Sequence, residues 1–357
     1  MKALLPLSWL YGIVVRLRNL AFDRGLLKTT GVSVPVISVG NITAGGTGKT
    51  PLVDYIAGYF LDRSKKVAVV SRGYGRKSTG VVVVSDGSTV LVDERMGGDE
   101  PVQLARKYPR LRVVVGERRV GAVRKAIDSL NAEIIVLDDA FQHRAIRRDL
   151  DIVVVRGEPG TAWDHLLPAG LHREPPGSLG RADLVAFSRI ADERQLAMAR
   201  ERAMTYFRGP CIGYRYTIET LALAEGAGVV LPAEAKEKTV LAFSGIGDPQ
   251  SFEADLRELG LNVKDHIRFR DHHRFTRNEF QQICRRGSTL GVEMIVTTEK
   301  DMVRLSGDRA IMAMVAQGVP LFVARLSIDI THGREEFHSL LDHCLVRSHE
   351  DVAPGNN

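Results

Sequence analysis

The sequence predicts an α/β protein, with a parallel sheet sandwiched by helices and a second, smaller α/β lobe after it. Short, nearly continuous apolar runs alternate with helical segments, which is typical of parallel strands buried on both faces. The composition shifts after Gly209-Pro210, and beyond that point the same alternation starts again. The 357 residues, 44% of them hydrophobic, are enough for one large or two medium-sized domains.

The chain opens with a segment that we expect to form an amphipathic helix within residues 1–30. Its apolar side chains recur at helical spacing, namely Leu7, Trp9, Leu10, Tyr11, Ile13, Val14, Leu17, Leu20 and Ala21. The run is shorter than the roughly 20 apolar residues that span a bilayer, and it lacks the cleavage site of a secretory signal. Arg16, Arg18, Arg24 and Lys28 supply cations, as in a helix that lies in a membrane interface. A helix packed on the protein's own core has the same periodicity, so this alternative stays open.

The two α/β parts follow in order along the chain. The core domain is expected over residues 31–224, with a helix at 51–61 and strands at 34–40, 66–70, 113–115, 134–137, 152–155 and 184–187. The second lobe is expected over residues 225–346, with a helix at 249–259 and strands at 239–243, 294–296 and 321–323. Residues 347–357 are expected to be a disordered tail.

The net charge limits the possible classes of binding partner, and the cysteine spacing limits the possible roles of the thiols. A net charge of +6 favours acidic partners, which include nucleotides, anionic lipid headgroups and nucleic acid. Cys211, Cys284 and Cys344 are too far apart for a zinc knuckle or a redox pair, and their odd number does not suit a disulfide framework. Reduced thiols in a cytosolic protein are the simplest interpretation.

The segment Asn41–Pro51 has the features of a phosphate-binding loop of the P-loop NTPase type. It leaves a buried strand and opens a helix, where backbone N–H groups surround phosphates, a lysine reaches the terminal ones and a hydroxyl binds Mg²⁺. The expected nucleotide-binding residues are Thr43, Ala44, Gly45, Gly46, Thr47, Gly48, Lys49, Thr50 and Pro51. Thr43 replaces the usual first glycine, but the other glycines leave the backbone free to wrap an anion. Ala44 stands where switch ATPases of one subclass carry a lysine, which argues against that class.

Acidic residues at two further places suggest chemistry. Asp138-Asp139 ends a buried strand, where P-loop enzymes keep the carboxylate that holds Mg²⁺, although paired acids also cap helices. Asp99-Glu100 follows a glycine turn, and by local rules alone a helix cap explains it slightly better than catalysis. The second lobe carries Arg270–Phe275, whose Asp-His-His group suits a His–carboxylate acid/base pair or solvated loop residues better than a metal site.

Together these segments resemble the tetraacyldisaccharide 4′-kinase (lipid A 4′-kinase) family over residues 4–345. The motifs that carry the resemblance are Pro6–Gly12, Gly25–Lys28, Val39–Pro51, Ser71–Arg76, Gly98–Pro101, Leu137–His143 and Thr297–Asp301. The resemblance implies Mg²⁺- and ATP-dependent phosphorylation of the 4′-hydroxyl of an acylated glucosamine disaccharide 1-phosphate. It also implies a peripheral enzyme on the cytoplasmic face of the bacterial inner membrane, whose N-terminal helix meets an anionic membrane surface.

The family's site residues transfer to matching positions of this chain. The resemblance implies that Asp99 is the base, that His272 pairs with it, and that Lys49 and Asp139 complete the catalytic group. The implied metal neighbourhood is Thr50, Asp138, Asp139, Gln142 and Glu174. The implied substrate contacts are Arg72, Tyr74, Glu100 and His143. Because Asp99 and His272 belong to different lobes, we expect the lobes to close during catalysis.

One departure from the family pattern and some alternatives accompany this prediction. Leu171-His172 replaces a Pro-Leu pair, which affects the stiffness of the loop before Glu174. The main rival is a P-loop switch or chaperone ATPase that acts with a protein partner; a soluble small-molecule kinase and an inactive nucleotide site fit less well. Thr297–Asp301 is a candidate adenine contact, which a plain strand-to-helix turn explains nearly as well. We expect a monomer that does not bind nucleic acid.

Overall fold

A computed structural model of the chain describes residues 4–45, 47–157, 165–226, 228–315 and 318–350, with side chains up to residue 345. The chain forms two compact units, Met1–Arg215 with Ile328–Asn357, and Tyr216–Ser327. These bounds differ from the expected second lobe of 225–346. The long strands β8 (Cys211–Leu223) and β13 (Leu321–His332) each begin in one unit and end in the other, so the chain changes unit inside a strand rather than in a linker.

The first unit is built on a mostly parallel sheet. Its strands are β1 (Val36–Gly40), β2 (Val67–Ser71), β3 (Val82–Asp86), β4 (Arg112–Val115), β5 (Ile134–Asp138), β6 (Leu150–Arg156) and β7 (Leu184–Ser188). The order is β7-β6-β1-β5-β2-β4-β3, and β3 alone in this series is antiparallel to its neighbour. Val39 of β1 lies beside Asp138 of β5, so the loops that follow these two strands leave the same edge of the sheet. Ligands of α/β sheets bind at such an edge.

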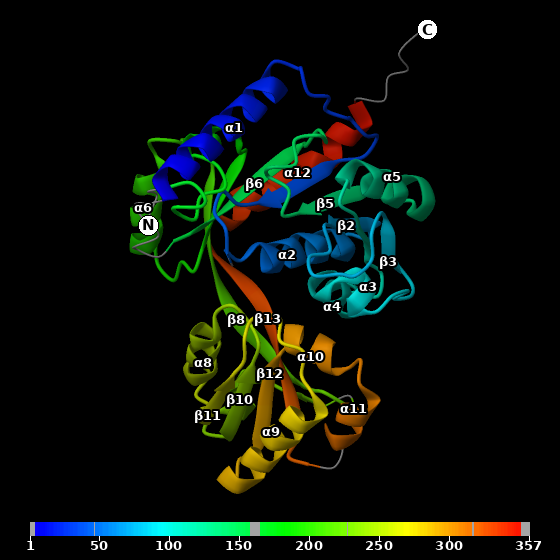
Figure 1. Cartoon of the computed structure of the whole chain (residues 1–357), viewed down its shortest axis with the longest axis vertical. Coiled ribbons are helices and arrows are strands. Elements are labelled where there is room, and N and C mark those ends of the chain that lie inside the picture. The colour runs from blue at the N-terminus through cyan, green and yellow to red at the C-terminus, as the bar shows by residue number, and fades with distance from the viewer. Residues whose placement is uncertain (1–3, 46, 158–164, 227, 316–317, 351–357) are drawn as a thin grey trace. The chain divides into compact units, whose positions relative to one another are not determined.

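Helices and a 3₁₀ turn surround this sheet (Figure 1). They are α2 (Lys49–Asp62), α3 (Glu94–Gly97), α4 (Asp99–Lys107), α5 (Arg119–Leu130), η2 (Pro176–Arg181), α6 (Glu193–Ala203) and α12 (Arg334–Glu350). Different strands of the sheet contribute to separate cores: Leu137 of β5 packs in a cluster with Val123 of α5, while Val153 of β6 packs in a cluster with Ala199 of α6. The fold class predicted from the sequence is confirmed.

The C-terminal segment corrects one expectation. Residues 347–350 belong to α12 rather than to a disordered tail, and residues 351–357 lie outside the described part of the chain. Phe337, Leu341 and Cys344 are buried at helical spacing and hold α12 on the first unit. The helix therefore extends one turn beyond the expected boundary.

The N-terminal helix α1 (Leu5–Asp23) lies along the outside of the first unit (Figure 1). Its buried residues are Ser8, Gly12 and Val15, and a Cβ added at Gly12 would come within 2.8 Å of the Leu166 side chain. The apolar face expected from the sequence is exposed, with Trp9 77%, Leu10 59% and Leu17 60% accessible. These large side chains therefore do not pack on the protein's own core. Within the described ranges, no helix combines the length and apolar character needed to cross a membrane.

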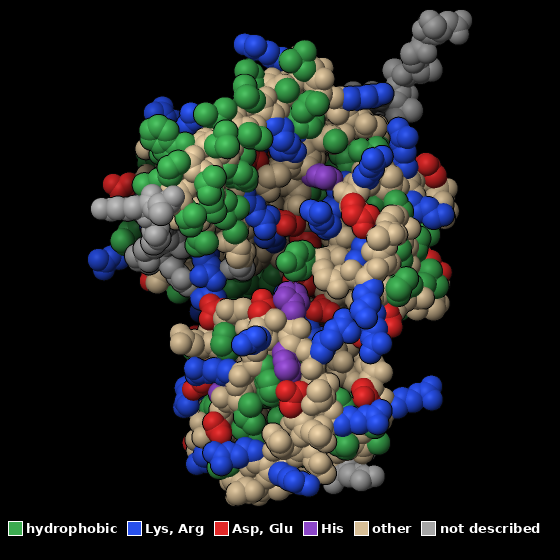
Figure 2. All heavy atoms as spheres, viewed as in Figure 1, with side chains coloured by type: hydrophobic (Ala, Val, Ile, Leu, Met, Phe, Trp, Pro, Cys, Tyr) green, Lys and Arg blue, Asp and Glu red, His purple; other side chains and the backbone are tan. Residues whose placement is uncertain are grey.

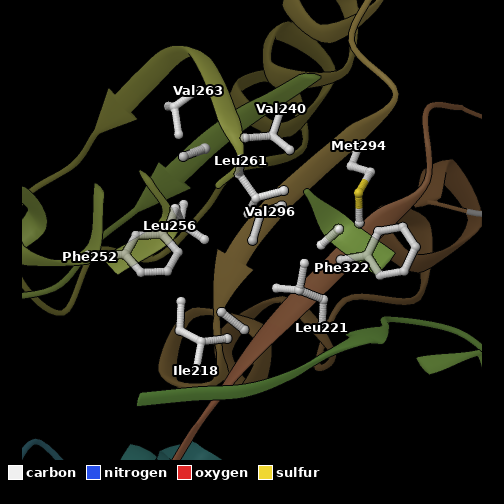
Figure 3. Close-up of a cluster of buried hydrophobic side chains, with 13 residues drawn as sticks. Ile218, Leu221, Val240, Phe252, Leu256, Leu261, Val263, Met294, Val296 and Phe322 are labelled. Carbon is white, nitrogen blue, oxygen red and sulfur yellow. The ribbon is translucent and has the colours of Figure 1, made fainter. Parts of the chain in front are cut away.

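The second unit is a smaller parallel sheet between helices. Its strands run in the order β11 (Asn262–Arg268), β10 (Thr239–Ser244), β12 (Met294–Thr298) and β13, and β9 (Val229–Val230) pairs with β8. The helices are α7 (Pro232–Ala235), α8 (Pro249–Glu258), α9 (Arg277–Leu290), α10 (Glu299–Leu305) and α11 (Arg309–Val315). Val240 faces a core that includes Phe252 of α8 (Figure 3), whereas its neighbour Leu241 faces a core that includes Phe280 of α9.

Candidate active site

The glycine loop joins β1 to α2 as the sequence predicts. Gly45 and Gly48 adopt φ values of 100° and 90°, which residues with a Cβ rarely adopt. Gly48 is the N-cap of α2 and has no side chain to cap the helix, so the amide N–H groups of the first turn can meet an anion. Gly46 lies outside the described residues.

Four contacts hold this loop, and three of them come from distant parts of the first unit. The Asn41 Nδ2 donates to Thr47 Oγ1 at 2.8 Å, and the Tyr214 hydroxyl donates to the Gly48 carbonyl at 3.0 Å. The Ala44 amide donates to the Leu171 carbonyl at 2.6 Å, and the next residue, His172, forms a β-bridge with Thr43. The segment that carries the Leu171-His172 departure thus lines the phosphate loop directly, and His172 is buried there.

Lys49 points at a carboxylate that a second cation also holds. Its Nζ lies 3.4 Å from Asp139 Oδ1, and Arg173 Nη1 lies 3.0 Å from both Asp139 oxygens. Burial opposes ionisation of Asp139, but Lys49 and Arg173 outweigh it and hold the pKa of this carboxyl below its ordinary value. Lysine and arginine are the side chains that bind phosphate oxygens, so the site offers a pair of cations beside the glycine loop.

The surroundings of Asp138 have the opposite effect to those of Asp139, because they favour the protonated carboxyl. Burial first, and then the charges of Glu100 and Asp139, raise the pKa of Asp138 from 3.8 to about 7. Among the described residues, its Oδ1 atom is buried without a hydrogen-bond partner. Nearby, the Thr50 hydroxyl donates to Glu100 Oε2 at 2.8 Å. Each of these neighbouring carboxylates raises the free energy of ionising the others. A bound cation would stabilise all of them in the ionised form.

Asp99 is placed by a close contact between two glycine turns. It is the first residue of α4, whose N-cap is Gly98, so Asp99 does not occupy the N-cap position that local rules favoured. Gly98 has a φ of 91°, and a Cβ added there would lie 3.2 Å from the Cα of Gly73. The Gly-Asp-Glu-Pro and Arg-Gly-Tyr-Gly segments are therefore packed together, and Tyr74 is 80% exposed beside them.

The other predicted residues of the first unit hold the surroundings together. Gln142 Nε2 donates to the Asn41 carbonyl at 2.9 Å, at the base of the phosphate loop. Glu174 is buried and accepts from Arg181 at 2.9 Å and from Asn19 of α1 at 2.8 Å. Burial, and then the surrounding arginines, lower the pKa of His143 to about 4, so this imidazole is neutral at physiological pH.

His272 is held within the second unit. Its backbone adopts a φ of 59°, its Nδ1 lies 3.2 Å from Arg304 Nη2, and its Nε2 lies 3.9 Å from Asp271 Oδ1. Because the arginine can only donate, Nδ1 accepts and the neutral ring carries its proton on Nε2. His273 pairs instead with Glu279 at 3.1 Å, so the two neighbouring histidines serve different partners.

The Thr297–Asp301 segment forms the strand-to-helix turn that the sequence left as one of two explanations. Thr298 is the N-cap of α10 and accepts from the Asp301 amide. The buried Asp301 carboxylate accepts from the Gly245 amide at 3.1 Å and pairs with Arg304 at 3.0 Å. This segment therefore supports the loop that carries His272.

Comparison with known proteins identifies the chain. Residues 1–345 match the family model described as tetraacyldisaccharide-1-P 4′-kinase. The chain belongs to this family. Tetraacyldisaccharide 4′-kinase of Chlorobium luteolum is 40% identical over 341 residues, 94% of this chain and 95% of that protein. The protein of that name from Anaeromyxobacter dehalogenans is 40% identical over 332 residues, 91% of this chain and 85% of that protein.

A solved relative supports the same conclusion for the fold. The crystal structure of LpxK from Aquifex aeolicus in complex with ATP matches with a TM-score of 0.76 and 32% identity, over 96% of this chain and 99% of that one. The family, the α/β fold and the assignment as a lipid-kinase enzyme of lipid A biosynthesis, all predicted from the sequence, are therefore confirmed.

The expected metal residues, Thr50, Asp138, Asp139, Gln142 and Glu174, stay a prediction. Among the described residues, no group of three or more His, Cys, Asp or Glu side chains is gathered closely enough to hold a metal ion. In the structure Asp139 pairs with Lys49 and Arg173, and Glu174 pairs with Arg181.

The structure also adds residues that sequence reasoning missed. One indication in the sequence pointed to Arg173, because it stands beside Glu174 in the segment compared with the family pattern. Its contact with Asp139 depends on the fold and could not be predicted. Tyr214 reaches the phosphate loop from β8, and nothing in its local sequence marks it. Asn41 opens the predicted loop segment, but its hydrogen bond to Thr47 was not predicted. Arg119 reaches the Asp138 carbonyl at 3.3 Å from the start of α5.

Proposed function

We propose that this protein transfers the γ-phosphoryl group of ATP to the 4′-hydroxyl of a tetraacylated glucosamine disaccharide 1-phosphate, in the manner of its family. The observation that carries the proposal is the cation pair at the phosphate loop, where Lys49 and Arg173 meet at Asp139 with a distance of 3.4 Å or less. Lys49 and the uncapped first turn of α2 bind the ATP phosphates, and Arg173 neutralises charge that develops during transfer.

Thr50 and Asp138 fit a magnesium ion. The fit rests on the buried, unpartnered Oδ1 of Asp138 and on its raised pKa, both of which a cation would relieve. Mg²⁺ keeps several waters and takes one or two protein oxygens besides phosphates, so a cluster of three carboxylates is not required. When bound, Mg²⁺ neutralises phosphate charge and orients the terminal phosphate for transfer.

Asp99 is the proposed general base for the sugar hydroxyl. A hydroxyl is a weak nucleophile at neutral pH, and a carboxylate that accepts its proton contributes about 10²–10⁴ in rate. The rigid contact of Gly98 with Gly73 fixes the start of α4 and so positions this carboxylate. His272 is proposed to pair with Asp99; the two residues belong to different units, so their cooperation is tested by kinetics.

The exposed face of α1 is proposed to bind the anionic cytoplasmic surface of the inner membrane, with the enzyme as a peripheral monomer. Figure 2 shows apolar side chains gathered over α1, and Leu7, Ile13 and Val14 are each more than half exposed. Burial of such side chains in a bilayer interface removes apolar area from water, at roughly 25 cal/mol per Å². The lipid acceptor lies in the same interface, so this contact brings enzyme and acceptor together.

The proposal is tested with purified protein, Mg·ATP and the acylated disaccharide 1-phosphate in detergent. The expected product is a bisphosphorylated lipid, and the Asp99→Ala variant should form it at least a hundredfold more slowly while still binding ATP. Asp128→Ala, on an exposed position of α5, is the matched control. If Asp99 and His272 act as a unit, the double variant loses little more than either single variant. Absence of lipid product, together with ATP hydrolysis that needs a protein partner, would indicate a switch ATPase instead.

A further inference from the structure

A buried ion pair on α10 lies beside the loop that carries His272 in the second unit. Arg304 Nη1 is 3.0 Å from Asp301 Oδ1, and the two side chains are 3% and 0% exposed. Taking both charges out of water is costly, and the attraction between them repays that cost only where further hydrogen bonds satisfy both groups. The remaining contacts of the pair therefore show what it holds in place.

The carboxylate of Asp301 is fixed by its own helix and by the turn after β10. Its Oδ2 accepts from the Gly245 amide at 3.1 Å and from the Thr298 hydroxyl at 2.6 Å. A Cβ added at Gly245 would lie 3.2 Å from Asp301 Oδ1, so the turn and the carboxylate are packed in contact. Asp301 thus has one defined position from which it orients the guanidinium of Arg304.

The two terminal nitrogens of Arg304 have different partners. Nη1 donates to the Gly245 carbonyl at 2.8 Å, in addition to its bond with Asp301. Nη2 lies 3.2 Å from Nδ1 of His272. Because the guanidinium is planar and rigid, the two bonds at Nη1 also fix the direction in which Nη2 donates. A buried ion pair is therefore aimed at one nitrogen of an exposed imidazole.

The backbone of His272 is held by the same turn. Its amide donates to the Gly245 carbonyl at 3.1 Å and to Asp271 Oδ1 at 2.9 Å. Its φ of 59° is uncommon for a residue with a Cβ, and such a conformation persists where the surroundings determine it and is often found at functional sites. The ring Nε2 lies 3.9 Å from Asp271 Oδ1, which is beyond hydrogen-bond distance.

We propose that Arg304 is a positioning residue of the kinase reaction, which holds His272 in the tautomer whose Nε2–H donates to the Asp99 carboxylate. The inference rests on the proposed function, in which His272 pairs with Asp99. A carboxylate only accepts, so a neutral imidazole that pairs with it must donate. An imidazole that is not held at Nδ1 divides its proton between the two nitrogens, and the form protonated at Nδ1 has no donor at Nε2. Arg304 acts through His272 and need not contact either substrate.

The variants separate positioning from stability. Arg304→Met removes the donor to His272 but leaves the Asp301 carboxylate buried without its cation, which endangers the fold. The double variant Asp301→Asn with Arg304→Met has no buried charge and still lacks the donor. Arg286→Gln is the control, because it breaks another Arg–Asp pair of the second unit, with Asp265 at 2.9 Å. The Arg304 variants are also made in a His272→Ala background.

The first readout needs no turnover. NMR of the protein with ¹⁵N-labelled histidine reports which ring nitrogen carries the proton, and the His272 signal is the one missing from His272→Ala. At a pH where the ring is neutral, the wild type and Arg286→Gln should show only the Nε2-protonated form. Both Arg304 variants should show exchange with the Nδ1-protonated form. If they keep the single Nε2-protonated form, the proposal is overturned.

The second readout is turnover in the lipid-kinase assay. Both Arg304 variants should lower kcat at least tenfold and leave the KM for ATP nearly unchanged. In the His272→Ala background the same substitutions should leave the residual kcat nearly unchanged, because the residue through which they act is gone. A tenfold loss that persists without His272, or a normal kcat in the Arg304 variants, would overturn the positioning role. If the wild type forms no bisphosphorylated lipid, the proposed function fails, whereas NMR still decides whether Arg304 sets the tautomer.

Discussion

The substitution Asp138→Asn should stabilise the protein while it removes activity. Asp138 is buried, and its pKa is raised from 3.8 to about 7 by burial and by the neighbouring carboxylates. At about 1.4 kcal/mol per pH unit, keeping this group ionised above pH 7 costs the folded state roughly 4 kcal/mol. An Asn side chain has no charge but still has a buried amide to satisfy, so we expect a gain of about 2 kcal/mol.

The pH dependence has a definite sign. Between pH 3.8 and about 7 the folded state holds a proton on Asp138 that the unfolded state has released. The free energy of unfolding of the wild type therefore falls as the pH rises through this window, relative to that of the Asn variant. The variant should be more stable than the wild type by about 2 kcal/mol at pH 8 and less stable by about 2 kcal/mol at pH 4, where Asp138 is protonated in the folded state.

The assay is urea unfolding without Mg²⁺ or ATP, followed by hydrogen exchange of the β1 and β5 amides. This readout separates the first unit from the second, which need not unfold in the same step. Asp128→Asn, on the exposed side of α5, is the matched control and should show no pH-dependent difference. Added Mg·ATP should stabilise the wild type and have much less effect on Asp138→Asn. A variant less stable than the wild type at pH 8, or a difference independent of pH, would refute the reasoning.

Two further predictions concern the placement of Asp99 and the face of α1. Gly98→Ala should reduce turnover at least tenfold with little change in ATP affinity, because the added Cβ meets Gly73 at 3.2 Å and the φ of 91° is strained for alanine; normal turnover in the lipid-kinase assay would show that this contact does not position Asp99. Leu10→Glu with Leu17→Glu should reduce sedimentation with anionic vesicles at least tenfold, because both side chains are more than half exposed. The control Lys125→Gln with Ser129→Glu makes the same change of net charge on α5; equal loss in that control would mean that charge, not the apolar face, drives binding.

The strands of the first unit were largely predictable because most of them are short, nearly continuous apolar runs. Sequence reasoning missed β3, β8, β9 and β11, and two of them show where that pattern fails. β3 is antiparallel and only half-buried at its start, and β11 carries Lys264, Asp265 and His266 within an edge strand. A strand covered on one face alternates apolar and polar residues and so resembles a loop.

The candidate site likewise has residues that the sequence could predict and contacts that it could not. The phosphate loop and the Asp138-Asp139 pair could be predicted because each depends on the end of one strand and the residues that follow it. The partners of these residues could not: Arg173 reaches Asp139 from 34 positions away, and Tyr214 reaches Gly48 from 166 positions away. The ion pairs of Asp139 with Arg173 and of Glu174 with Arg181 could not be predicted either, and the expected place of both carboxylates near a metal ion stays a prediction.

The N-terminal helix shows most clearly what the sequence decides and what the tertiary structure decides. The sequence by itself determined that the segment is an amphipathic helix, because the spacing of its apolar residues matches the helical period. Only the tertiary structure decided which way that helix faces: the small residues Ser8 and Gly12 allow close contact with the segment around Leu166, and Trp9, Leu10 and Leu17 are left in solvent. Periodicity is a local property of the backbone, but the choice of face depends on contacts with residues more than 150 positions away.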